Sequence, residues 1–207
     1  MNQHIQVKKI LFLAANPKGT APLRLDEELR EIATGLRLAK NRDHFILECK
    51  WAVRFRDVQR AILDFKPQIV HFSGHSVENE GLIFEDNAGR EKFVDLEGLA
   101  GLFEVFHEQV QCVVLNVWHS KVQAEAIAQH INYVIGMNRQ IGNRAASEFS
   151  VAFYDALAAE ESVEFAYKYG CKAIRLVGIP EQLTPILVKK PNLSEVATQP
   201  DTSKEIR

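Results

Sequence analysis

The chain has few cysteines and no long apolar run. Its 207 residues include only Cys49, Cys112 and Cys171, which lie far apart in apolar segments. An odd number of widely spaced cysteines is typical of free thiols in a reducing cytoplasm, and it argues against a disulfide framework or a zinc site. No apolar stretch reaches the roughly 18 residues that cross a bilayer. We therefore expect no membrane-spanning segment.

An excess of charge of one sign is also missing. The chain carries 25 Lys and Arg against 27 Asp and Glu, a net charge of -2. This balance gives no general attraction to nucleic acid or to anionic membranes, so we expect neither as a partner. The first residues lead directly into a strand-like run, which predicts no signal peptide and a cytoplasmic protein.

Motifs that bind phosphate or metal are absent from the sequence. It contains neither G-x-x-x-x-G-K-[ST] nor G-x-G-x-x-G, and no H-E-x-x-H, so we expect no cofactor and no metal. Residues 16–20 form a loop between a strand and a helix, where the helix start favours weak anion binding. A simple connecting loop is the better interpretation. A nucleotide or small-ligand sensor nevertheless remains an alternative function.

The chain does have the composition of an ordinary globular protein, with 46% apolar and 25% charged residues. Apolar runs that predict buried strands alternate with segments of helical periodicity. Strands are expected at 8–15, 44–53, 68–72, 111–115, 133–137 and 183–188, and helices at 23–40, 58–65, 96–105, 124–130, 145–159 and 163–172. Residues 81–85 and 90–94 predict a small β-hairpin.

This alternation predicts an α/β three-layer sandwich, with a mostly parallel sheet of about six strands flanked by helices. Residues 1–190 are expected to form one domain, followed by a polar, disordered tail at 191–207. Functional groups in such folds gather beyond the carboxyl ends of the strands. His75 follows one buried strand and Trp118 follows another, so both are expected at the same end of the sheet.

Two segments at these strand ends resemble a known family. Residues 71–75 (H-F-S-G-H) and 115–120 (L-N-V-W-H-S) are similar to the motifs H-F-S-G-H-G and L-N-A-C-Y-S of CHAT domains, which are bacterial caspase-like cysteine peptidases. Further similar segments lie at 10–17, 23–28, 81–86, 123–128 and 134–137. The resemblance implies a caspase-like fold for the whole body and places the catalytic histidine at His75.

The departures from the family pattern concern the chemistry. Trp118 stands where the family has its nucleophilic cysteine, and Ser76 replaces the glycine whose backbone N–H helps to bind the oxyanion. Indole is not a nucleophile, and loss of the nucleophile removes several powers of ten in rate. Gly74 shares the turn of His75. Candidate binding residues flank Trp118, namely Asn116, His119 and Ser120.

These departures predict a catalytically inactive pseudo-peptidase. The resemblance implies that such a protein acts as an interaction, scaffold or regulatory component in a bacterial defence or stress-signalling system. The resemblance implies a protein partner, such as a catalytically intact CHAT protease or an NTPase or repeat sensor protein, and leaves a homo-oligomer open. Trp118 either fills the old cleft or stays exposed as an anchor for the partner. An active hydrolase with a displaced nucleophile is a second alternative function. Cys112 is expected in the core, and His71 is expected to hydrogen-bond within the sheet.

Overall fold

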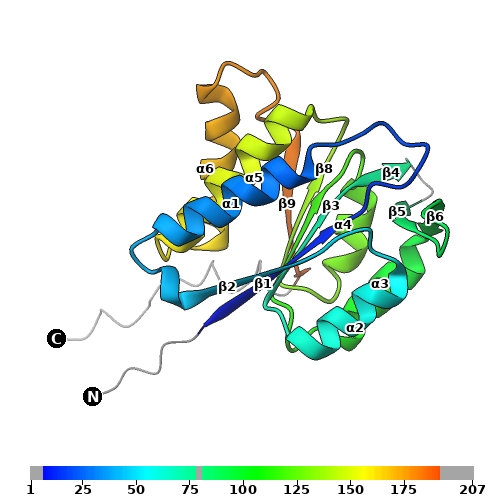
Figure 1. Cartoon of the computed structure of the whole chain (residues 1–207). Helices are drawn as coiled ribbons and strands as arrows, with labels where there is room; N and C mark the ends of the chain where they lie inside the picture. The colour runs from blue at the N-terminus through cyan, green and yellow to red at the C-terminus, as the bar shows by residue number, and fades with distance from the viewer. Residues whose placement is uncertain (1–6, 78–80, 192–207) are drawn as a thin grey trace, which may run out of the picture.

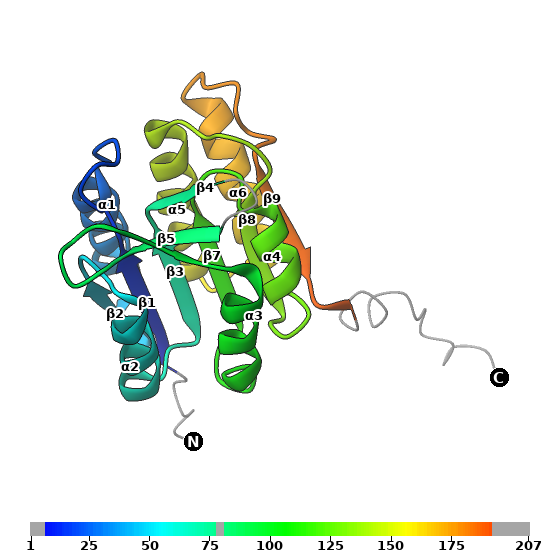
Figure 2. The same cartoon turned by 90° about the vertical axis from the view of Figure 1, so that its right-hand side faces the viewer.

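A six-stranded sheet forms the centre of the molecule. The computed structural model describes residues 7–77 and 81–191. The strands lie in the order β2-β1-β3-β7-β8-β9 (Figure 2). Their bounds are Lys8–Ala14 (β1), Phe45–Lys50 (β2), Ile69–Ser73 (β3), Cys112–Asn116 (β7), Tyr133–Met137 (β8) and Pro185–Lys189 (β9). All neighbours pair in parallel except β8 and β9, so the predicted mostly parallel sheet is confirmed.

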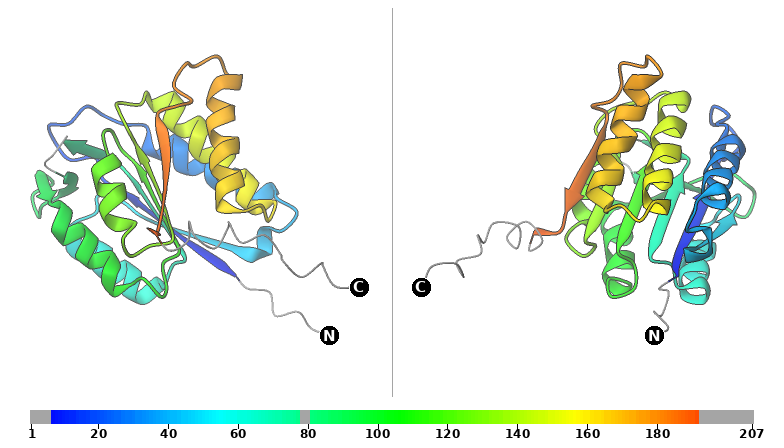
Figure 3. Two further views of the ribbon diagram at one scale, coloured as in Figure 1. Left: turned by 180° about the vertical axis from the view of Figure 1, so that it is seen from behind. Right: turned by 90° about the vertical axis from the view of Figure 1, so that its left-hand side faces the viewer.

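Helices cover both faces of this sheet (Figures 1 and 3). One face carries α1 (Leu25–Leu38), α5 (Asn143–Ala158) and α6 (Val163–Leu176), and the other carries α2 (Phe55–Phe65), α3 (Leu96–Val105) and α4 (Lys121–Ile127). Successive residues of a strand point to opposite faces, so Leu11 joins the core beneath α2 to α4 while Phe12 joins the core beneath α1, α5 and α6. Burial on both faces explains why the central strands read as continuous apolar runs.

A second, smaller sheet lies beyond the carboxyl ends of β1 and β3 (Figure 1). Its antiparallel strands are β4 (His75–Val77), β5 (Gly81–Glu85) and β6 (Glu91–Val94). The predicted hairpin is therefore confirmed as β5 and β6. The segment that begins at His75 was expected to be a turn, and this was wrong. It adds β4 to the edge of the hairpin because His75 pairs with Ile83.

Several predicted boundaries were wrong where a backbone conformation or a capping hydrogen bond overrides the apolar pattern. β2 ends at Lys50 and not at Val53, because Ala52 takes a left-handed conformation (φ 51°). A short 3-10 helix, Arg42–His44, precedes it. α2 begins at Phe55, three residues before the predicted start, since the Asp57 carboxylate accepts a hydrogen bond from the backbone N–H of Arg54 (3.2 Å). The predicted tail lies outside the described residues, apart from Pro191.

Candidate functional site

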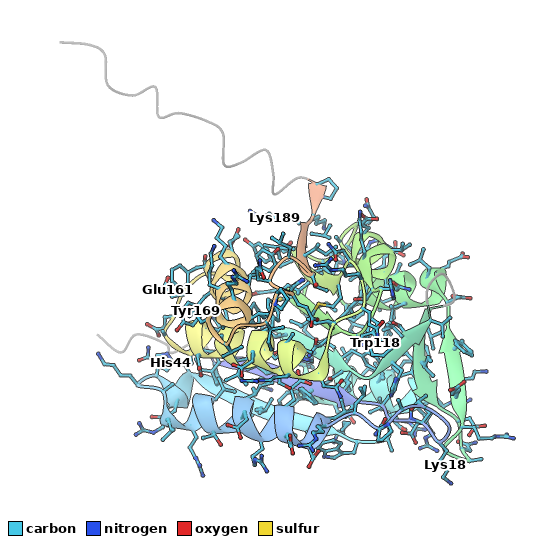
Figure 4. The ribbon with its side chains drawn as sticks, turned by 90° about the horizontal axis from the view of Figure 1, so that it is seen from above. Lys18, His44, Trp118, Glu161, Tyr169 and Lys189 are labelled. Carbon is cyan, nitrogen blue, oxygen red and sulfur yellow. The ribbon has the colours of Figure 1, made fainter. Side chains whose placement is uncertain are left out.

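Adjacent strands bring His75 and Trp118 to one end of the sheet. β3 and β7 are parallel neighbours in which Ser73 lies opposite Asn116. His75 and Trp118 each follow two residues later, so their loops meet at the carboxyl end. The Ser76 hydroxyl donates a hydrogen bond to the backbone carbonyl of Trp118 and joins the two loops directly. Figure 4 shows Trp118 at this end, away from His44 at the start of β2.

The indole of Trp118 is held within the fold. Its Nε1–H donates a hydrogen bond to the backbone carbonyl oxygen of Ile141 at 2.7 Å. The partly buried ring packs against the core beneath α1, α5 and α6. Indole has one polar donor, and the loop before α5 uses it. The Trp118 side chain is therefore directed toward α5, and its single N–H is not available to His75.

The ring of His75 is oriented by an amide. Its Nε2 lies 3.1 Å from Oδ1 of Asn16, which follows β1. An amide oxygen only accepts, so Nε2 carries the proton in this arrangement. Burial lowers the pKa of His75 below its ordinary value, and Glu91 opposes this effect in part. Asn16 was expected to lie in a connecting loop, and no local sequence pattern reports this contact, because the two residues lie 59 positions apart.

Gly74 and Ser76, on either side of His75, lie in close contact with neighbouring segments of the chain. A Cβ atom on Gly74 would lie 2.7 Å from the backbone oxygen of Ala15, so only glycine fits between β3 and β4. Ser76 occupies the place that the family pattern gives to glycine. Its hydroxyl donates a hydrogen bond to the backbone carbonyl of Trp118. In a serine nucleophile this proton would instead be directed at a base.

A buried carboxylate lies directly beneath this end of the sheet. Glu28 of α1 is only 3% exposed. Its Oε2 accepts a hydrogen bond from the Ser73 hydroxyl, and its Oε1 accepts one from Nδ2 of Asn116, both at 2.7 Å. The Nε2 atom of His71 lies 3.3 Å from the same Oε1. One carboxylate thereby ties helix α1 to the ends of β3 and β7.

His71 extends this buried network to α5. Its Nδ1 lies 3.1 Å from the hydroxyl oxygen of Tyr154, and its ring stacks on Phe12 with centroids 4.7 Å apart. The expectation that His71 bonds within the sheet was therefore wrong, because its ring nitrogens reach the helices instead. Burial raises the pKa of Glu28, but its interactions with His71, Ser73 and Ser150 together outweigh burial and leave that pKa below its ordinary value.

A small cavity separates Trp118 from this network. Its volume is about 30 Å³, and its lining includes Glu28, Asn116, Trp118 and Ile141. Among the described residues, no donor contacts Oδ1 of Asn116, which is buried there. A space of this size holds about one water molecule, not the side chain of a substrate.

The remaining candidate residues, Ser120 and His119, make hydrogen bonds within the fold. Ser120 is fully buried, where its hydroxyl donates to the Val117 carbonyl and accepts from the backbone N–H of Met137. The backbone N–H of His119 bonds to the Arg139 carbonyl at 3.5 Å, in a left-handed conformation. Complete burial raises the pKa of Cys112 to about 12, so its thiol is not ionised. Cys112 lies in the core, as predicted.

Two further properties concern the described part of the chain as a whole. Residues 7–77 and 81–191 bring no three His, Cys, Asp or Glu side chains into an arrangement that would hold a metal ion. Within the same residues, no helix has the length and apolar character needed to cross a membrane.

Comparison with known proteins identifies the family. The model of the CHAT domain matches residues 2–167, which is most of the chain. The chain belongs to the CHAT domain family. It is 27% identical over 177 residues to a Roc-COR-CHAT protease from an unknown prokaryotic organism, and 28% identical over 173 residues to a protein from Gillisia limnaea named "Probable protease". These matches include 82% and 81% of this chain but only 17% and 30% of the two relatives.

Solved structures with the same fold are caspase-like. A secreted C11 cysteine protease from Bacteroides thetaiotaomicron, in complex with an irreversible peptide inhibitor, superposes with a TM-score of 0.65 at 12% identity, covering 92% of this CHAT domain and 68% of that chain. The Drosophila initiator caspase Dronc has a TM-score of 0.59 at 9% identity, covering 91% and 82%. At these identities the likeness shows the fold alone, and it confirms the predicted caspase-like sandwich.

Proposed function

We propose that this CHAT domain is a pseudo-peptidase that binds a protein partner and does not cleave peptides. The observation that carries the proposal is Trp118 at the place of the nucleophilic cysteine in the family motif. Covalent peptide cleavage begins when a thiolate or an alkoxide attacks the carbonyl carbon. The indole ring of Trp118 has no group that can make this attack.

The surroundings of His75 support the same proposal. A working dyad places the nucleophile within hydrogen-bond reach of the imidazole. Here the Nε2 of His75 meets the amide oxygen of Asn16, and the adjacent hydroxyl, that of Ser76, is bonded to a backbone carbonyl. The His75 imidazole and the Ser76 hydroxyl thus stabilise the loops at this end of the sheet, and neither attacks a carbonyl carbon.

Fluorogenic peptides ending in Asp, Arg or Lys test this proposal. We expect the purified protein to release no more fluorophore than buffer does, and His75→Ala to match the wild type. Release that the wild type catalyses and that His75→Ala abolishes would refute the proposal. That result would instead support a displaced nucleophile.

We further propose that the partner is a catalytically intact CHAT protease or an NTPase or repeat sensor protein, within a cytoplasmic bacterial defence or stress-signalling assembly. Supporting this, the matched region makes up less than a third of each of the two relatives, so in them the domain is joined to much more chain. Chemical cross-linking in the native host, followed by purification and mass spectrometry, is expected to recover such a protein. Recovery of monomer alone would count against it.

A further inference from the structure

Strand β2 leaves one edge of the main sheet unpaired. Within the described residues it pairs only with β1, at the end of the strand order (Figure 2). An edge strand offers a row of backbone N–H and C=O groups to another strand. Ile46, on this strand, is 46% exposed, and Trp51, which follows it, is 51% exposed. Beside the strand, a hollow of about 450 Å³ separates Glu48 and Lys50 from helix α2. This edge is therefore open to a second strand.

The opposite edge, β9, is less suited to pairing. It begins with Pro185 and ends with Lys189, and Lys190 and Pro191 follow it. Proline removes backbone donors, and like charges disfavour pairing with a second copy of the same strand. β2 contains no proline, and its charges are of opposite sign.

The charges of β2 are complementary to themselves. Glu48 and Lys50 lie on the same face of the strand, 2.7 Å apart between Oε1 and Nζ. Suppose two copies of β2 run antiparallel about a two-fold axis at Cys49. Glu48 of each copy then lies opposite Lys50 of the other, which produces two cross-strand ion pairs. A two-fold axis at Glu48 would instead place the two carboxylates opposite each other.

We propose that β2 pairs antiparallel with β2 of a second copy through Glu48, Cys49 and Lys50, in the register centred on Cys49, so that the edges of the two main sheets join in a homodimer. The proposal does not rest on the proposed function. His75 and Trp118 follow β3 and β7, and β1 lies between these strands and the β2 edge. We assign a second copy to this edge because the segment Glu-Cys-Lys, read in reverse, places a charge of opposite sign across from each of its own charges.

Charge variants at this edge test the register. Sedimentation equilibrium of the full chain is expected to show a species of twice 23.4 kDa that forms with increasing concentration. Glu48→Lys and Lys50→Glu should each raise the dimer dissociation constant about tenfold or more, since each places like charges opposite one another. The double variant restores opposite charges and should restore the dimer. Circular dichroism checks that every variant is folded.

Cys49 offers a second, independent measurement. In this register the two Cys49 residues are direct cross-strand neighbours, at a separation that a disulfide spans. Diamide, which accepts two electrons and two protons from a pair of thiols, should then cross-link the dimer. The reaction needs alkaline pH, because burial raises the pKa of Cys49 to about 11. Cys49→Ser should abolish the cross-link, and Cys171→Ser, the matched control, should retain it.

Three results would overturn the proposal. The first is a single 23.4 kDa species at every concentration up to the solubility limit. The second is a dimer whose dissociation constant is the same in Glu48→Lys and Lys50→Glu as in the wild type. The third is a dimer that diamide does not cross-link through Cys49.

Discussion

Glu28 shows how one residue organises the end of this sheet. Its carboxylate accepts hydrogen bonds from Ser73 and Asn116, which lie at the carboxyl ends of neighbouring strands, and it faces His71 from the same side. A buried anion requires partners of this kind, because transfer from water into the interior is costly. The network thus fixes the positions of the two segments that carry His75 and Trp118.

Replacement of Glu28 by Gln is expected to destabilise the protein by about 2 kcal/mol, because an amide has one acceptor oxygen and its NH2 group then faces a buried donor that is left unpaired. Chemical denaturation at neutral pH measures this loss. The adjacent Glu27→Gln is the control, since the Glu27 side chain is 42% exposed and forms a surface ion pair with Arg24, so the variant should change stability by less than about 0.5 kcal/mol. Equal effects of the two variants would contradict the role assigned to Glu28.

The same variant has a predicted pH dependence. The pKa of Glu28 is below its ordinary value of 4.5 in the folded protein. Its contribution to stability is therefore complete above pH 4.5 and is lost as pH falls through the lower, folded-state pKa. The difference in unfolding free energy between wild type and Glu28→Gln should shrink over this acidic range. A difference that stays constant would show that the carboxylate charge is not what stabilises the network.

Sequence reasoning located His75 and Trp118 but missed two residues that orient this end of the sheet. Glu28 lies in the acidic first turn of α1, where carboxylates at exposed positions are common. Asn16 lies in a loop whose path the sequence does not fix. Both depend on contacts across large sequence separations, and no local pattern reports such contacts.

At the scale of elements, the packing of α5 on α6 depends on one small residue. A Cβ atom on Gly170 would lie 2.8 Å from Cδ2 of Phe149 and 2.9 Å from its backbone oxygen. Glycine usually weakens a helix interior, so its presence here allows the two helices to approach closely. These helices cover the face of the sheet against which Trp118 packs.

Gly170→Ala should therefore destabilise the protein by about 2 kcal/mol, despite the better helix propensity of alanine, because the added methyl group overpacks the α5–α6 contact. Gly101→Ala in α3 is the matched control. No atom lies within 4 Å of the Cβ position there, so this variant should be neutral or stabilising by up to about 1 kcal/mol. Thermal unfolding of the two variants under the same conditions compares them. A neutral Gly170→Ala would show that the two helices move apart easily.

Elements with strong periodicity were predictable, and elements fixed by pairing were not. The helix at 96–105 and the strand at 133–137 match the sequence pattern residue for residue. β4 has three residues and no apolar signal of its own, and it is a strand only because β5 lies beside it. α4 begins at Lys121, three residues before the predicted start at 124, because its first turn includes the polar residues Lys121 and Gln123, which the apolar pattern does not report.

At the scale of the whole molecule, the sheet and its helices are those of a caspase-like enzyme, whereas the side chain in the nucleophile position is not. The sheet needs only buried strands in the right order, which explains why the fold persists at 12% identity to the C11 protease. Fold therefore does not fix activity, and the chemistry depends on one or two positions. Our proposal assigns this role in the CHAT domain to position 118.

The most direct measurement is the intact mass of the protein after incubation with electrophilic peptide inhibitors that form covalent adducts with active-site nucleophiles. We expect the wild type to keep its mass of 23.4 kDa, while Trp118→Cys gains one adduct at position 118. Such an adduct in the variant would show that the inhibitor reaches the site. An adduct on the wild type, mapped beside His75 and lost in His75→Ala, would contradict the account.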